Sequence, residues 1–346
     1  MDFSQSGINE STLFCYESVS GSCPKPIISI SMRVAKYIFL VTAIALTVCG
    51  NLFVIISIAH FKQLHTPTNY LTLSLAVADF LLGGFIMPPS MIRSVESCWY
   101  FGDFFCKVHT STDIMLSTAS ILHLSFISID RYYAVCYPLR YKTTITVFVT
   151  LNMIFISWTV SAIVGFGMVF LGLNIQGIED FYYKNFDCVG GCILIQSEAS
   201  SMVSSFLSFY IPGLIMIGIY LKIFLVARRQ ARSIRDTEQQ RQNTEEKKNT
   251  TANKRERKAA KTLGTVMGVF LISWLPFFLF NIMDPFFNYS TPALLVDALV
   301  WFGYLNSTFN PFVYAFFYSW FRKALRIIAL GKVFQNGSSR TKLFDE

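Results

Sequence analysis

Residues 38–59 read IFLVTAIALTVCGNLFVIISIA, an apolar run of 22 residues without a charge. A helix rises about 1.5 Å per residue, so such a run spans roughly 30 Å, the thickness of the hydrocarbon layer of a bilayer. Six further stretches are of this kind, two of them interrupted by a single acid, Asp79 or Asp113: residues 64–92, 108–129, 143–178, 199–221, 262–283 and 298–321. Residues 143–178 are too few for two spans, so we expect one, at about 147–171. The sequence therefore predicts an all-α membrane protein, a seven-transmembrane helix bundle.

Charge and composition exclude an ordinary soluble enzyme. Of the 346 residues, 53% are apolar and 14% are charged, about half the charged share of a soluble domain. With the N-terminus outside the cell, the outer segments hold only six of the 29 Lys and Arg residues, and the positive-inside rule favours this orientation. The net charge of +8 then lies beside anionic lipid, so membrane lipid is an expected partner and nucleic acid is not.

Three regions follow from this pattern: an extracellular tail at 1–33, the seven-helix domain at 34–330 and a cytoplasmic tail at 331–346. Residues 228–261 are predicted to be a cytoplasmic loop with a disordered, polar middle, and residues 320–330 a short amphipathic helix at the membrane surface. The first apolar run has no cleavage signal, and we expect it to be retained. Six of the eight cysteines lie in outer segments and predict disulfides there, and Asn9 begins a glycosylation sequon.

Asp113 is a carboxylate inside the third span, where a charge costs about 2.5–3.5 kcal/mol on insertion scales. No Lys or Arg of the neighbouring spans lies at its depth, so a cationic ligand is the simplest counter-charge. An aspartate held by hydroxyl groups, or protonated, is the alternative. Aromatic rings and hydroxyl groups in the later spans favour an arylalkylamine as the ligand. The alternative is structural: aromatic rings also pack against other side chains, and serine hydroxyls also bond to the backbone of their own helix. These residues are Trp274, Phe277, Phe278, Trp301, Tyr304, Ser200, Ser204 and Ser208.

Two more polar groups lie deeper in the predicted bundle. Asp79 is expected near Ser120, Asn306, Ser307 and Asn310, either as a site for a small cation such as Na⁺ or as a structural hydrogen-bond network. At the cytoplasmic end of the third span stand Asp130, Arg131 and Tyr132. Glu256, in the basic start of the sixth helix, is a candidate partner of Arg131 in a resting state.

The motifs, taken in chain order, resemble those of the rhodopsin-like G-protein-coupled receptors over about residues 34–330. They are Gly50-Asn51, LAVAD at 75–79, Asp130-Arg131-Tyr132, Trp158, Pro212, Tyr220, Phe270, WLP at 274–276 and NPFVY at 310–314. Asp113, together with the rings of the sixth and seventh spans, is similar to the amine-receptor branch. Residues 306–321, NSTFNPFVYAFFYSWF, resemble the trace-amine-associated receptors, and residues 60–67, 98–102 and 125–130 are most similar to the type 1 branch of that family.

This resemblance implies a plasma-membrane receptor for primary arylethylamines such as phenethylamine and tyramine. It implies signalling mainly through the stimulatory G protein to adenylyl cyclase and cyclic AMP. By position, Asp113 binds the ammonium group, and the other ligand contacts are Ile114, Ser117, Ile193, Leu194, Ser204, Ser208, Trp274, Phe277, Phe278 and Tyr304. The residues implied in activation and G-protein coupling are Asp130, Arg131, Tyr132, Pro138, Tyr220, Glu256, Phe270, Asn310, Pro311 and Tyr314. No cofactor is expected beyond an allosteric sodium ion, held by Asp79, Ser120, Asn306 and Asn310.

The resemblance also implies a Cys106–Cys192 disulfide, and it leaves Cys188 to pair with either Cys15 or Cys23. The chain departs from diamine-sensing relatives in the fifth span. Ser204 and Ser205 stand where those relatives place a second acid, so we do not expect polyamines as ligands.

Other classes of protein fit less well. A retinal-linked light sensor needs a lysine in the seventh span, and residues 298–321 have none. A transporter of cationic amines would favour internal repeats, which are not evident. The four histidines show no metal spacing and no nucleophile motif is present, so we do not expect an enzyme. A receptor for serotonin, dopamine or noradrenaline remains the alternative, and so does retention of part of the receptor inside the cell.

Overall fold

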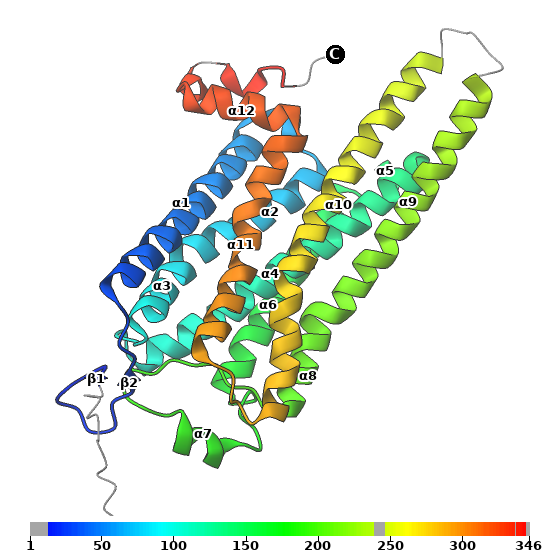
Figure 1. Cartoon of the computed structure of the whole chain (residues 1–346). Helices are drawn as coiled ribbons and strands as arrows, with labels where there is room; N and C mark the ends of the chain where they lie inside the picture. The colour runs from blue at the N-terminus through cyan, green and yellow to red at the C-terminus, as the bar shows by residue number, and fades with distance from the viewer. Residues whose placement is uncertain (1–12, 239–245, 336, 344–346) are drawn as a thin grey trace, which may run out of the picture.

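Long apolar helices make up most of the computed structural model, which describes residues 13–238, 246–335 and 337–343. Of residues 227, 230–238 and 246–263 only the backbone is described. The bundle in Figure 1 is formed by α1 (Ile30–His60), α2 (Pro67–Leu81) with α3 (Met87–Glu96), α4 (Asp103–Cys136), α6 (Val147–Phe170), α8 (Glu198–Ser205) with α9 (Ile211–Glu238), α10 (Glu246–Met283) and α11 (Ala293–Phe317).

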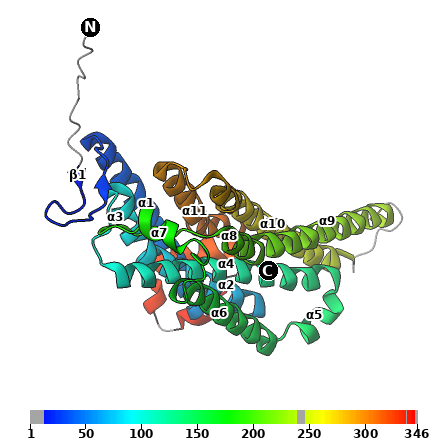
Figure 2. The same ribbon diagram turned by 90° about the horizontal axis from the view of Figure 1, so that it is seen from below.

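Smaller elements cap the two ends of the bundle. A two-stranded antiparallel ribbon, β1 (Leu13–Phe14) with β2 (Pro24–Lys25), lies at the same end as α7 (Glu179–Asn185), as Figures 1 and 2 show. At the other end lie α5 (Pro138–Thr144) and the amphipathic helix α12 (Ser319–Ala329), close to the predicted position. Single turns complete the described chain: η1 (Lys62–Leu64), η4 (Asp284–Phe287), η5 (Lys332–Phe334) and η6 (Ser338–Arg340).

Six helical spans among the described residues are long and apolar enough to cross a membrane. They are Ile30–His60, Pro67–Glu96, Asp103–Cys136, Val147–Phe170, Glu198–Val226 and Gly264–Phe287. Helix α11 is not one of them, and its buried face carries Asn306, Ser307 and Asn310. It nevertheless packs against both α1 and α10 as a full member of the bundle. The predicted seven-helix fold is therefore confirmed.

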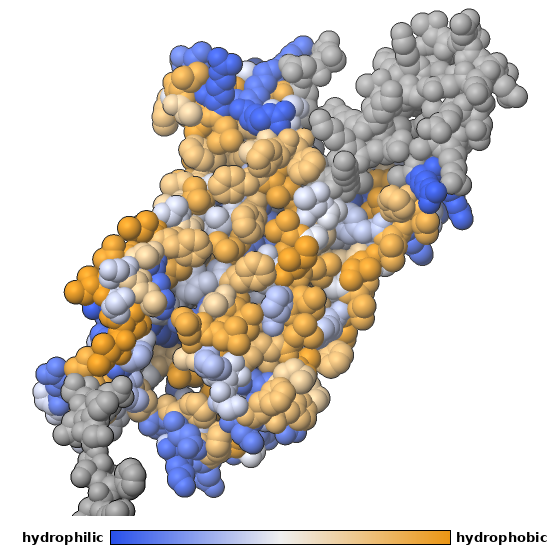
Figure 3. Space-filling view, viewed as in Figure 1, coloured by the Kyte–Doolittle hydropathy of each residue, from blue (hydrophilic) through white to orange (hydrophobic). Residues whose placement is uncertain are grey.

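The middle of the face that Figure 3 shows, over α1, α11, α10 and α9, is largely apolar. On α6, the side chains of Phe148, Phe155 and Ile163 are 68–75% exposed. A soluble monomer rarely exposes a continuous apolar surface of this kind, because its contact with water is unfavourable. Lipid is the environment in which such a surface is stable, in agreement with a multi-pass membrane protein.

Local irregularities set which side chains face the interior. The π-turns η2 (Leu82–Ile86) and η3 (Phe206–Tyr210) interrupt the second and fifth spans, and each adds one residue to a helical turn. Pro276 and Pro311 lie inside α10 and α11, where proline removes a backbone hydrogen bond and bends the helix. The four-residue spacing of Ser204 and Ser208 alone would place them on one face of a regular helix. Because η3 lies between them, they do not share such a face.

Asn51 connects α1 to α11 inside the bundle. Its side-chain amide donates hydrogen bonds to the backbone carbonyls of Thr47 and Ser307, at 2.9 and 3.0 Å, and the residue is fully buried. The hydroxyl groups of Thr47 and Thr308 meet across the same interface at 2.6 Å. Such bonds matter in a membrane because lipid supplies no hydrophobic drive for helices to associate.

Replacement of Asn51 by alanine tests this connection. Asn51→Ala leaves a buried carbonyl on α11 without its donor, so we expect a loss of about 1 kcal/mol and a lower melting temperature of the purified receptor. Asn152→Ala is the matched control, because Asn152 is exposed and bonds only to Phe148 of its own helix, at 2.9 Å. Equal melting temperatures for both variants would contradict the assignment.

Candidate functional site

Asp113 lies on α4 and turns its carboxylate toward α11. The hydroxyl of Tyr304 donates to Oδ2 at 2.5 Å, and the hydroxyl of Ser117 donates to Oδ1 at 3.4 Å. The ion pairs among the described residues are Lys25–Glu96, Arg33–Glu96 and Arg131–Asp130, so Asp113 has none. Its side chain is only partly covered by protein, whereas Tyr304 is fully buried. The result is a carboxyl group hydrogen-bonded by two hydroxyl groups, with part of its surface left for a further partner.

Aromatic side chains of α10 are connected to this carboxylate through α11. A Cβ atom placed on Gly303 would lie 2.7 Å from the Trp274 ring, so only glycine allows this close approach. The next residue of α11, Tyr304, bonds to Asp113. Trp274 is in edge contact with Phe277, with ring centroids 5.7 Å apart, and Phe278 is buried 4.6 Å from Phe209 in a stacked pair. Helix α11 thus contacts both the aromatic cluster and the carboxylate.

The polar residues of the fifth span meet a second network, which includes residues that the sequence analysis missed. Ser204 donates to the side-chain oxygen of Gln196 at 2.9 Å. Asn281 on α10 donates to Gln196 at 3.3 Å and to Ser205 at 3.0 Å. Gln196 and Ser205 are buried, whereas Ser200 and Ser208 are half-buried. The sequence did contain a signal for this network: Asn281 is an uncharged polar residue in an apolar span.

The long outer loop is fixed over the bundle by disulfides. Cys106 at the start of α4 is joined to Cys192, and Arg93 of α3 donates to the Cys192 carbonyl at 3.2 Å. Of the two residues around Cys192 that the resemblance assigns to the ligand, Ile193 is exposed and Leu194 half-buried. Ile195 and Gln196, which follow them, are buried.

Two more disulfides attach the N-terminal segment. Cys188 pairs with Cys23 rather than Cys15, which resolves the alternative that the sequence left open. Cys15 pairs with Cys98, a bond that the sequence analysis did not assign. The tail is further held by Lys25, whose ammonium lies 2.9 Å from the Glu96 carboxylate. That carboxylate raises the pKa of Lys25 through a hydrogen bond and its charge, although burial acts in the opposite direction.

Asp79 is fully buried at the centre of the bundle, with hydroxyl and amide donors around it. Ser120, Ser307 and Asn310 donate to its carboxylate at 3.1, 2.7 and 2.8 Å. Asn306 does not bond to it, and the side-chain oxygens of Asn306 and Asn310 are buried without a hydrogen-bond partner among the described residues. A carboxylate, two hydroxyls and free amide oxygens are suitable ligands for a small hard cation, so these residues fit a sodium ion.

At the C-terminal end of α4, Arg131 is held by its neighbour Asp130. Its Nη2 atom lies 2.5 Å from the Asp130 carboxylate, which also accepts hydrogen bonds from Thr68 and Tyr141, each at 2.8 Å. Arg131 also donates to the hydroxyl of Thr68. The side chain of Glu256 lies outside the described residues, so its pairing with Arg131 stays a prediction.

Tyr141, on α5, was not a candidate in the sequence analysis. Burial raises its pKa to about 12, and the negative charge of Asp130 acts in the same direction. Its hydroxyl therefore stays protonated at neutral pH and remains a donor to Asp130. Only the folding of α5 against α4 reveals this role, because the sequence between the third and fourth spans carries no motif that points to it.

The other residues implied in coupling lie at several depths of the bundle, and Phe270 contacts Phe209 with ring centroids 5.9 Å apart. Phe270, Tyr220 and Tyr314 lie inside the bundle, and the hydroxyls of the two tyrosines are buried without a partner among the described residues. Pro311 packs against Gly50 of α1. Tyr132 and Pro138 lie nearer the surface, Pro138 as the first residue of α5.

Comparison with known proteins agrees with this geometry. Residues 50–314 match the model of the 7 transmembrane receptor (rhodopsin family). The chain belongs to this family. It is 59% identical to "Trace amine-associated receptor 1" of Macaca mulatta and 58% identical to that of Homo sapiens, over 96% of this chain and 98% of each relative. It is 51% identical to "Trace amine-associated receptor 4" of Rattus norvegicus, over 96% of this chain and 95% of the relative.

The chain is thus a G-protein-coupled receptor of the trace amine-associated type, and not an enzyme. A receptor of this family binds a small-molecule amine at one end of the bundle and couples to a G protein at the other. The two polar sites described above lie in opposite halves of α4, Asp113 ten residues after the start of the helix and Arg131 near its C-terminal end. Asn9 lies outside the described residues, so its glycosylation stays a prediction.

Disulfide mapping tests the outer architecture of the receptor. Peptide mass spectrometry of the unreduced protein should recover peptides linked through Cys15–Cys98, Cys23–Cys188 and Cys106–Cys192. The same peptides should separate after reduction. Recovery of a Cys15–Cys188 link as the main species would contradict the placement of the N-terminal segment.

Proposed function

We propose that this receptor binds primary arylethylamines, such as phenethylamine and tyramine, with their ammonium group on Asp113. The observation that carries the proposal is the carboxylate of Asp113, which has hydroxyl donors but no ion pair among the described residues. A carboxylate inside a membrane protein requires a partner of opposite charge or a polar one. A protonated amine from outside the cell supplies that charge.

The surroundings of Asp113 support an amine with one aromatic ring. Trp274, Phe277 and Phe278 offer ring surfaces that attract both a flat apolar group and a cation. Ile114 and Ser117 flank the carboxylate along α4, and Ser204 and Ser208 are the proposed polar contacts at the far end. Ser204 and Ser205 supply no second carboxylate, so a diamine would leave one ammonium without a counter-charge.

Activation is proposed to be a shift between two states of the bundle. A ring pressed against Trp274 favours a state in which the inner end of α10, bent at Pro276, swings outward. Arg131 then leaves Asp130 and becomes available to the G protein. The proposed docking surface includes Arg131, Tyr132, Pro138, Tyr220, Glu256 and Tyr314, and the G protein is proposed to be the stimulatory type, which raises cyclic AMP through adenylyl cyclase.

Two further proposals concern the setting of the receptor. The N-terminus is proposed to be extracellular and the receptor to reside in the plasma membrane. The disulfides at the end that carries β1, β2 and α7 support this, because disulfides persist in an oxidising compartment. Asp79 with Ser120, Ser307, Asn306 and Asn310 is proposed to hold a sodium ion in the resting state, where the ion would add positive charge beside the buried carboxylate.

Removal of the carboxylate tests the ligand proposal. Asp113→Ala should lower the potency of phenethylamine in a cyclic-AMP assay by at least about 30-fold, since loss of one partner of a desolvated ion pair costs about 2–5 kcal/mol. Surface expression, read by an antibody against an N-terminal tag, should persist. Unchanged potency would refute the assignment. A panel that includes serotonin, dopamine and noradrenaline, run on the unaltered receptor, separates the proposal from the alternative amines.

Neutralisation of Asp130 tests the coupling proposal. Asp130→Asn leaves Arg131 without its ion-pair partner, so we expect cyclic AMP in the absence of amine to rise several-fold. Arg140→Gln, which alters an exposed charge on α5, is the control and should leave that basal level unchanged. A basal level in Asp130→Asn equal to the control, at equal surface expression, would show that the pair does not restrain the receptor.

A further inference from the structure

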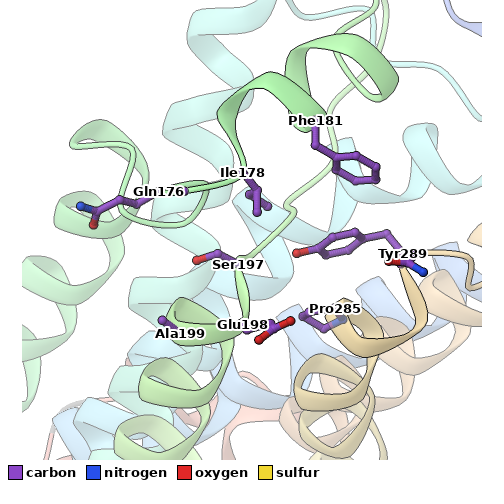
Figure 4. A pocket seen from close by; sticks show the side chains of 10 residues that line it. Gln176, Ile178, Phe181, Ser197, Glu198, Ala199, Pro285 and Tyr289 are labelled. Carbon is purple, nitrogen blue, oxygen red and sulfur yellow. The ribbon is translucent and has the colours of Figure 1, made fainter.

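The two ends of the bundle differ in how the chain covers them. At the end that carries α7, a cavity of about 430 Å³ lies between α7, the start of α8 and the loop after η4, and Figure 4 shows Phe181, Glu198 and Tyr289 in its walls. At the opposite end, the C-terminal segment folds over the turn that joins the first two spans, beside α12 in Figure 1. The contacts at this second end lead to Arg131.

The C-terminal segment reverses its direction twice after α12. Gly331 and Gly337 have φ of 67° and 82°, in the left-handed region that favours glycine. The turn η6 (Ser338–Arg340) thereby reaches η1 (Lys62–Leu64), the turn between α1 and α2. The last described residues of the chain therefore pack against the connection between its first two spans.

Leu343 anchors this segment by burial. Its side chain is only 1% exposed and belongs to the same hydrophobic cluster as Phe61 and Leu64, which are fully buried. Its backbone amide donates to the side-chain oxygen of Gln63 at 2.9 Å. Phe334, which lies earlier in the same segment, is 90% exposed. The segment is thus held at one particular apolar residue, because removal of its surface from water is favourable.

His60 supplies a second attachment. Its Nε2 atom lies 2.9 Å from the hydroxyl oxygen of Ser338, and that hydroxyl donates to the backbone carbonyl of Val333 at 2.7 Å. A hydroxyl has a single hydrogen to donate, so His60 is the donor to Ser338 and carries its hydrogen on Nε2. The last residue of α1 is therefore bonded to the first residue of η6.

The turn η1 is connected in its other direction to the polar residues at the end of α4. The side-chain amide of Asn69 donates to the backbone carbonyl of Leu64 at 2.8 Å, which ties the first turn of α2 to η1. Thr68 lies in that same turn of α2. Its hydroxyl donates to Asp130 at 2.8 Å and accepts a hydrogen bond from Arg131. A displacement of η1 therefore moves a side chain that holds Arg131.

We propose that residues 337–343 form a latch, which fixes η1 and the first turn of α2 and so keeps Thr68 bonded to Arg131. The latch and Asp130 then restrain the same guanidinium group from two different helices. When the latch is released, Thr68 withdraws and Arg131 loses its partner on α2. The consequence for signalling rests on the proposed coupling role of Arg131: a receptor with the latch released is more active in the absence of amine.

Hydrogen exchange measures the latch without amine or G protein. In full-length receptor in nanodiscs, Leu343→Ser should speed exchange of the backbone amides of residues 64–70 at least about fivefold, because the segment loses its buried anchor. Gly337→Ala should act in the same direction. Its Cβ atom would meet no atom of the described residues within 4 Å, so only the left-handed backbone opposes it. Phe334→Ser is the matched control and should leave the exchange unchanged, because this side chain is exposed.

The connection to Arg131 is measured in the same experiment at the end of α4. Leu343→Ser should also speed exchange of residues 131–136, and Thr68→Ala should do so by itself. In a receptor that already carries Thr68→Ala, Leu343→Ser should have no further effect at 131–136, although it still speeds exchange of residues 64–66. Effects of the two substitutions that add in full at 131–136 would show that the latch does not act through Thr68, and would overturn the proposal.

Two further results would also overturn it. One is exchange of residues 64–70 that is equal in Leu343→Ser, Gly337→Ala and Phe334→Ser. The other is a basal signal that does not respond: cyclic AMP without amine should rise at least about twofold in Leu343→Ser over Phe334→Ser at equal surface expression, and equal levels would exclude a restraint on signalling. Asp130→Asn, measured alongside, shows separately whether Arg131 acts as proposed.

Discussion

The carboxylate of Asp113 lies inside an apolar bundle with hydroxyl groups as its hydrogen-bond partners and no ion pair among the described residues, and the arrangement around it follows from that constraint. A charge in the hydrocarbon region costs about 2.5–3.5 kcal/mol on insertion scales, and more where it is shielded from water. Tyr304 and Ser117 each supply one hydrogen bond, and neither supplies a positive charge. The residue is therefore held in place and left ready for a cation, which is the property that an amine receptor needs.

Helix α11 connects Asp113 to the second buried carboxylate, Asp79. On one face it presents Tyr304 to Asp113, then Ser307 and Asn310 to Asp79. Those polar residues explain why, within the part of the chain that the structure describes, α11 is the bundle helix that is not apolar enough to be identified as a span. Its neighbour α10 is linked to the same face where the Trp274 ring packs against Gly303. A change at the outer carboxylate thus has a continuous packed path to the inner half of the receptor.

Hydropathy alone predicted the helices because their surfaces face lipid. The fourth span was expected at 147–171, and α6 runs over Val147–Phe170. The long-range partners of these side chains were not predictable, because Gln196 meets Asn281, Tyr141 meets Thr68 and Cys15 meets Cys98, each far away in sequence. The π-turn η3 was missed because no residue type marks it, and it alters which serines of the fifth span face inward. The charged residues of the site could thus be identified from the sequence, whereas their hydrogen-bond partners could be identified only from the folded structure.

The central claim is that Asp113 and the ligand's ammonium group interact directly, and a double-mutant cycle between protein and ligand measures it. Binding of phenethylamine and of phenethyl alcohol, which replaces the ammonium with an uncharged hydroxyl, is compared in the unaltered receptor and in Asp113→Asn. The account predicts a coupling free energy of about 2–5 kcal/mol, with the amine's advantage confined to the receptor that has the carboxylate. A coupling energy near zero, with the amine favoured equally in both receptors, would contradict it.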